Sequence, residues 1–150
     1  MNNISIEINN SIGVDFPEKL AKESVFRTVK NVSPKSLEEK DIEISMGVVS
    51  AREIRKINLK FRKKDEPTDI LSFSGDKDGI NFETGENKNF YLGEIVICPE
   101  YIEEWAKKNK VKYEYEICLA CCHATLHLLG FVHGTKMFSV QEKIAKEITL

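Results

Sequence analysis

The chain has 150 residues, of which 41% are hydrophobic, so one domain covering residues 1–150 can bury an ordinary core without disulfides to hold it together. No run approaches the ~18 apolar residues that a membrane span needs, and the opening MNNISIEINN lacks the features of a secretory signal, so we expect a cytoplasmic protein with no membrane partner. The net charge of −2 argues at first against a nucleic-acid partner.

Two alternating patterns predict strands in the first third of the chain, at ISIEI and at DIEISMGVV. Between them, Pro17 opens a helix that we expect to run to about Val32, because proline is favoured in a first helical turn. Both strands place apolar residues at every second position, which is typical of a sheet with one buried face.

A second helix is predicted to follow Ser50, which forms a capping box with Glu53. Ile54, Ile57 and Phe61 share one side of this helix, and we expect that side to face the core. Residues 51–64 carry seven basic residues and one acid, a local charge of +6 that leaves −8 for the rest of the chain. This basic stripe is a candidate phosphate-binding surface, and its alternative is a solvated helix face. The candidate phosphate contacts in it are Arg52, Arg55, Lys56, Lys60, Arg62 and Lys63.

The second half of the chain begins with strands at DILSFS and YLGEIVIC, separated by the polar, glycine-dotted segment GDKDGINFETGENKNF, which we expect to be a loop. Three helices follow. They are predicted over EYIEEWAKKNK after Pro99, from about Tyr113 to Leu129 with Gly130 as its C-terminal cap, and near KMFSVQEKIAKEI. About four strands and five helices predict an α+β domain, with a single mixed sheet covered by helices.

Three histidines stand in the segment HATLHLLGFVH, and they are the only ones in the chain. His123 and His127 are four residues apart on the predicted helix and therefore project from one face. Gly130 lets the chain reverse and return His133 as a third ligand. This spacing predicts a metal site on a helix and the turn after it, with the fourth position open to water as in catalytic zinc sites.

The same spacing occurs in the zinc-binding run HExxHxxGxxH of metzincin proteases, except that Ala124 occupies the position of the catalytic Glu. Without that base peptide hydrolysis is disfavoured, whereas phosphodiester cleavage is compatible with a metal and an arginine. Glu116 lies seven residues before His123 on nearly the same face and is a candidate to orient a ligand or a water. The four cysteines are expected to be reduced, buried hydrophobes.

Three segments, in order, resemble the YbeY family of bacterial endoribonucleases. FRKKDEPTDILSF is similar to the family's YRxxDxPTDVLSF, LGEIVIC to its LGDIVI strand, and HATLHLLGFVH to its HGxLHLLGYDH signature, with Val132 in place of the Asp. The resemblance implies one metal ion, usually zinc, on His123, His127 and His133. It also implies single-stranded RNA rather than DNA as substrate, with partners in ribosomal RNA and the small ribosomal subunit.

The activity that this resemblance implies is metal-dependent endoribonuclease action in small-subunit (16S) ribosomal RNA maturation and ribosome quality control. Arg62 matches the family's YRxxD arginine and is the candidate to hold a phosphate, because a guanidinium can bind two phosphate oxygens at once. Two alternatives remain open. One is a non-catalytic RNA-binding ribosome-assembly factor with a structural metal, and the other is a metzincin-like protease, which Ala124 disfavours.

Overall fold

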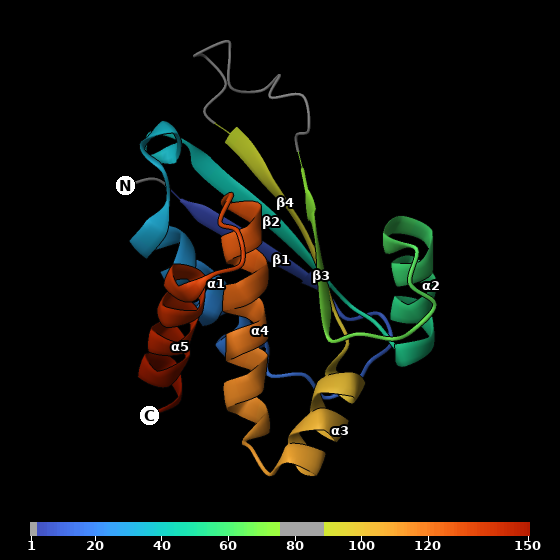
Figure 1. The fold of residues 1–150 in the computed structure, drawn as a ribbon. Coiled ribbons are helices and arrows are strands. Elements are labelled where there is room, and N and C mark those ends of the chain that lie inside the picture. The colour runs from blue at the N-terminus through green and yellow to red at the C-terminus, as the bar shows by residue number, and fades with distance from the viewer. Residues whose placement is uncertain (1–2, 76–88) are drawn as a thin grey trace.

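The fold, given by a computed structural model that describes residues 3–75 and 89–150, is one mixed sheet with helices around it (Figure 1). This confirms the predicted α+β class. No helix in the described ranges is long and apolar enough to cross a membrane. The strands are β1 (Ile4–Asn9), β2 (Asp41–Val48), β3 (Ile70–Ser74) and β4 (Asn89–Ile97). The helices are α1 (Glu18–Val32), α2 (Ala51–Arg62), α3 (Pro99–Asn109), α4 (Tyr113–Leu128) and α5 (Thr135–Thr149), with a 3-10 turn at Lys35–Leu37.

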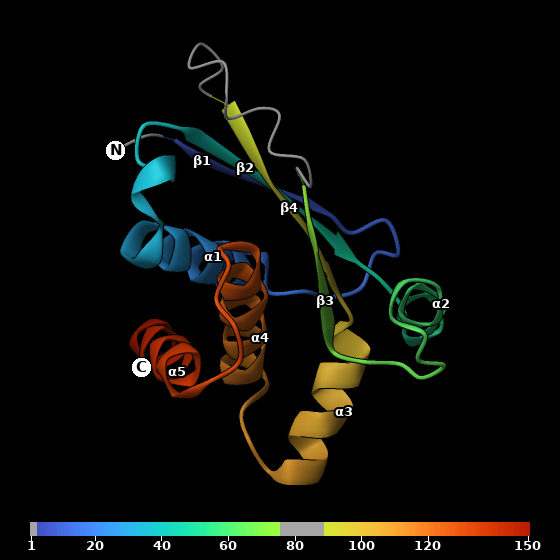
Figure 2. The ribbon, with the colours of Figure 1, turned by 45° about the horizontal axis from the view of Figure 1, so that its top comes forward.

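The sheet has the strand order β1-β2-β4-β3, in which β1, β2 and β4 are parallel and the edge strand β3 is antiparallel to β4. Helices α1, α4 and α5 lie on one side of the sheet, while α2 lies on the opposite side, next to β3 (Figure 2). Because β3 stands between α2 and α4, side chains from both helices can meet around this edge strand.

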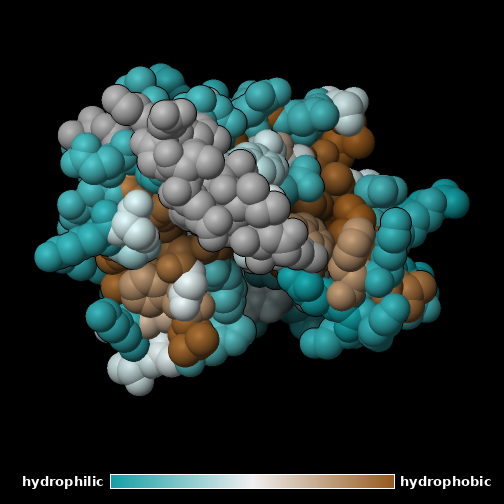
Figure 3. All heavy atoms as spheres, turned by 90° about the horizontal axis from the view of Figure 1, so that it is seen from above, coloured by the Kyte–Doolittle hydropathy of each residue, from teal (hydrophilic) through white to brown (hydrophobic). Residues whose placement is uncertain are grey.

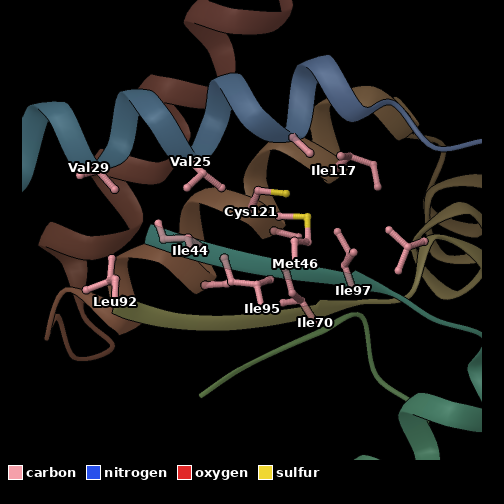
Figure 4. Packing of buried hydrophobic residues seen from close by; sticks show 14 of the residues in the cluster. Val25, Val29, Ile44, Met46, Ile70, Leu92, Ile95, Ile97, Ile117 and Cys121 are labelled. Carbon is pink, nitrogen blue, oxygen red and sulfur yellow. The ribbon is translucent and has the colours of Figure 1, made fainter. Parts of the chain in front are cut away.

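The main core fills the space between α1, α4 and the sheet (Figure 4). Val25 and Val29 point from α1 toward Ile44 and Met46 of β2, and all four are almost fully buried. The four cysteines are also buried and unpaired, as predicted, so they serve as small core side chains.

A bulge in β4 sets the register of the sheet. Tyr91 pairs with Glu43 whereas Gly93 pairs with Ile44, so Leu92 is the extra residue. Gly93 has a φ of 152°, and a Cβ there would collide with the Phe73 carbonyl and lie 2.8 Å from Leu128 Cδ2. Only glycine fits this position, which gives a structural reason for the Gly of the LGEIVIC segment.

Helix α2 packs on the second side of the sheet through a small cluster of Ile54, Val96 and Cys98. The Ser50 half of the predicted capping box is present, because the Ser50 hydroxyl accepts a hydrogen bond from the Glu53 backbone N–H at 3.2 Å. The expectation that Phe61 faces the core is wrong, since this side chain is 54% exposed. Phe61 lies two turns beyond Ile54, about 10 Å along the axis, where the helix has passed the cluster.

The predicted loop before β4 mostly falls on residues 76–88, which lie outside the described residues. For its last two residues the prediction is wrong, because Asn89 and Phe90 belong to β4 and Phe90 is buried. At the other end of the chain, Gly130 follows α4 with a φ of 95°, a left-handed conformation that favours glycine. The predicted chain reversal after α4 is therefore present.

Candidate metal centre

The three histidines converge on one point. The Nε2 atom of His127 lies 3.1 Å from that of His123 and 3.2 Å from that of His133, and the third pair is 3.3 Å apart. His123 and His127 come from successive turns of α4, and the reversal at Gly130 returns His133 to them. The sequence prediction that these side chains meet is confirmed.

These distances fit a tetrahedral metal ion. With metal–nitrogen bonds of about 2.0–2.1 Å, three corners of a tetrahedron lie about 3.3–3.4 Å apart. The three Nε2 atoms lie at nearly that separation. Within the described parts of the chain, no other group of three His, Cys, Asp or Glu side chains brings its ligand atoms so close together. The triad could therefore hold one ion and leave a fourth position free.

A buried glutamine on α5 fixes the protonation of one ligand. His123 Nδ1 lies 2.9 Å from the Oε1 atom of Gln141, whose side chain is 7% exposed. A carbonyl oxygen only accepts hydrogen bonds, so Nδ1 must carry the proton. The lone pair of His123 is then on Nε2 and points at the centre of the triad, which is the tautomer that a metal needs.

The surroundings also keep the second ligand neutral. Burial lowers the pKa of His127, and the nearby His123 and His133 lower it further. An interaction with the Phe131 backbone opposes this shift, while Arg62 adds to it. A neutral imidazole is the form that binds metals, so these neighbours favour a ligand over an imidazolium.

Arg62 lines the same cavity as the triad, a cleft of about 430 Å³ that we call the histidine cleft. Its Nη2 atom donates to the Ser72 carbonyl at 2.8 Å, and its guanidinium lies 5.0 Å from the centre of the Phe73 ring. Among the described residues no carboxylate lies within ion-pair distance of Arg62. The arginine is held beside the triad with its charge available to an anion. The cleft is lined by Arg62, Ile70, Leu71, Ser72, Ser74, His123, Ala124, His127 and His133.

This lining, as far as the structure describes it, contains no carboxylate. Ala124, which follows the first histidine, is 1% exposed and supplies only a methyl group. Val132, just before the third histidine, is 79% exposed. Neither position can take a proton, so the titratable groups of the described lining are the three histidines and Arg62.

Glu116 lies in a separate cavity with Asp69, Tyr101 and Trp105. Burial raises the pKa of its carboxyl, and the charge of Asp69 raises it further. The two helical turns between Glu116 and His123 span about 10 Å, which explains why residues on one face of α4 do not share a cavity. The structure thus does not bring Glu116 together with the triad, and its catalytic role stays a prediction.

The basic residues of α2 are all exposed, and of the six candidate RNA contacts only Arg62 lines the histidine cleft. Arg55 is already paired with Asp65, through contacts of 2.8 and 3.3 Å. Lys60 lies over the Phe61 ring at 5.2 Å from its centre. The other candidates are Arg52, Lys56 and Lys63, which lie on the exposed surface of this helix and its exit.

Two neighbours of the triad were not predicted. Gln141 supports His123, and the Phe138 ring lies parallel to that of His133 with centres 6.1 Å apart. The sequence does single out Gln141, because this polar residue lies on the same buried side of α5 as Met137 and Ile144. A polar residue on an apolar stripe needs a partner, and here that partner is a metal-site histidine.

Comparison with known proteins gives matches that cover most of the chain. The family model described as Endoribonuclease YbeY matches residues 6–149. A protein of that name from Sulfurihydrogenibium is 33% identical over 141 residues, which are 88% of this chain and 89% of the relative. Another from Bacillus velezensis is 30% identical, with coverage of 97% and 94%. The solution structure of a Thermotoga maritima protein has a TM-score of 0.62 and 30% identity, and the match covers 95% of this chain and 88% of that one.

Proposed function

Because the chain belongs to the YbeY family, and its relatives from Sulfurihydrogenibium and Bacillus velezensis are named endoribonucleases, we propose that it cleaves single-stranded RNA in the histidine cleft. The observation that carries this proposal is the convergence of three Nε2 atoms within 3.1–3.3 Å of one another in a cavity that Arg62 also lines. A metal ligand set and a guanidinium that no carboxylate of the described residues pairs can together neutralise the charge of a phosphodiester.

His123, His127 and His133 would hold one divalent ion, which we propose to be zinc because a set of three imidazoles in tetrahedral geometry suits it. Such an ion supplies Lewis-acid polarisation of a phosphoryl oxygen and lowers the pKa of an attacking water. Gln141 contributes by keeping the proton of His123 on Nδ1, and the lowered pKa of His127 keeps that ligand neutral near pH 7.

Arg62 would bind the non-bridging oxygens of the scissile or an adjacent phosphate. The bond from Nη2 to the Ser72 carbonyl fixes its direction, and the remaining guanidinium N–H groups can donate to the phosphate. Since charge grows on these oxygens as the phosphoryl group reacts, a donor fixed beforehand stabilises the transition state more than the ground state.

The other basic residues of α2 would contact the RNA backbone outside the cleft and so contribute to affinity rather than to catalysis. We further propose that the substrate is the small-subunit (16S) ribosomal RNA, as part of its maturation in the cytoplasm and of ribosome quality control. The ground for this finer step is the family resemblance of the three sequence segments. Cells depleted of the protein should then accumulate unprocessed small-subunit RNA.

A cleavage assay tests the proposal. The zinc-loaded protein should cut a single-stranded RNA and spare a duplex of the same sequence, and a chelator should abolish cutting until zinc is restored. His127→Ala should behave like the chelated protein and bind less than half an equivalent of metal. If no preparation cuts RNA although both metal and RNA bind, a non-catalytic RNA-binding assembly factor replaces the nuclease. Glu116→Gln, tested in parallel, should lower the rate only if this acid takes part.

A further inference from the structure

Phe61 is an aromatic side chain that α2 leaves more than half exposed. Figure 3 shows apolar surface next to hydrophilic surface on the side of the molecule where α2 lies. A single exposed aromatic residue is ordinary, so its significance depends on what surrounds it.

The ring of Phe61 is held by a second aromatic ring from the edge strand. The centres of Phe61 and Phe73 are 5.2 Å apart and their planes cross at 63°, an edge contact. Phe73 is half-buried and packs against the cluster of Ile54, Val96 and Cys98. Phe73 is thereby anchored in the fold, and it fixes the position of the more exposed ring.

A basic side chain lies beside each ring. Lys60 Nζ lies 5.2 Å from the centre of Phe61, and the Arg62 guanidinium lies 5.0 Å from the centre of Phe73. Arg62, whose guanidinium lies over the Phe73 ring, is also a lining residue of the histidine cleft. The aromatic pair is therefore connected to the cleft through Arg62, and a basic group lies beside each ring.

We propose that Phe61 and Phe73 form a stacking platform for an unpaired base of RNA, next to the nucleotide held in the histidine cleft. The inference rests on the function proposed above. Aromatic rings with adjacent basic groups bind single strands, because every base offers a π face and every nucleotide a phosphate. In a duplex the bases are already stacked on one another, so a platform beside the cleft would favour single-stranded substrates.

Fluorescence anisotropy with a labelled, unstructured RNA of about twelve nucleotides tests the platform, with a gel after each titration to check that the RNA is intact. Phe61→Leu should weaken binding by about 5- to 150-fold, the range for loss of one stacked base. The slope of log affinity against log salt should not change, because no charge is removed. Phe61→Tyr should bind within about twofold of the original protein. Leu59→Ala is the matched control, since Leu59 is a 46% exposed apolar residue of the same helix.

An RNA series with one abasic position identifies the stacked base. The original protein should lose affinity when the abasic site reaches one position, and Phe61→Leu should be insensitive to that site. The platform is overturned if Phe61→Leu binds as the original protein does, or if Leu59→Ala costs as much. The platform is also overturned if Phe61→Leu still loses affinity when the abasic site reaches that position. A protein that neither binds nor cuts single-stranded RNA overturns the proposed function as well, whereas normal cleavage with a neutral Phe61→Leu overturns the platform alone.

Discussion

Replacing Gln141 with methionine should weaken metal binding, although Gln141 is not itself a metal ligand. Its side chain acts through His123, to which it is hydrogen-bonded. The Oε1 atom of Gln141 accepts a hydrogen bond from His123 Nδ1–H over an N–O distance of 2.9 Å, and Gln141 is 7% exposed, so water cannot replace it easily. Loss of such an outer partner typically costs 10- to 100-fold in metal affinity, which corresponds to about 1.4–2.8 kcal/mol. Methionine has nearly the volume of glutamine, so Gln141→Met should leave no cavity.

The measurement is a competition titration of zinc against a chromophoric chelator, alongside thermal unfolding of the metal-free protein. Gln141→Met should lose metal affinity within the stated range, while the metal-free proteins should differ in stability by no more than about 1 kcal/mol. Gln141→Glu is the matched control, because a carboxylate retains the acceptor and should keep or tighten metal binding. Equal zinc affinity in Gln141→Met and the original protein would refute the role assigned to this hydrogen bond.

Three other predictions follow from the structure. Replacing Lys60 and Lys63 together by alanine should reduce the slope of log affinity against log salt for single-stranded RNA by about 1.4, and it should weaken binding to different RNA sequences about equally. An unchanged slope would mean that α2 is a solvated helix face without a role in RNA binding. Arg62→Lys should keep much of the RNA affinity but lose about 10- to 1000-fold in cleavage rate, measured under single turnover, because an ammonium cannot reproduce the guanidinium fork. Gly93→Ala should destabilise the protein to urea by at least about 2 kcal/mol because of its positive φ and the neighbouring carbonyl, whereas Gly47→Ala, with nothing within 4 Å of the added Cβ, should cost under about 1 kcal/mol.

Elements whose signals are local were predictable from the sequence. The Ser50 cap, the alternation in β2 and the reversal at Gly130 each depend on residues within one or two turns of each other. The histidine triad belongs to this class as well, since two ligands share a helix face and the third follows six residues later. Local spacing therefore contained most of the metal site.

Features that depend on contacts between distant segments were not predictable in the same way. The register of α2 placed Phe61 on the apolar side, but only the position of the sheet shows that the helix has passed its packing partners there. Glu116 shares a face with His123, yet the cavity around it is lined by Asp69 and Trp105 from other elements. Gln141 reaches His123 across the α4–α5 interface, which no spacing within either helix reveals.

The bond between Arg62 and the Ser72 carbonyl also has a consequence for self-association. Strand β3 ends the sheet, and an edge strand with open carbonyl and N–H groups can pair with a strand of another molecule. Arg62 occupies one of these acceptors and places a positive charge over the edge. We therefore expect the side chain that we assign to phosphate binding also to hinder pairing at the sheet edge, and Arg62→Ala should leave this edge open to a second copy of the chain. Light scattering of this variant should detect the aggregation, and Arg62→Lys, which keeps the charge at the edge, should suppress it.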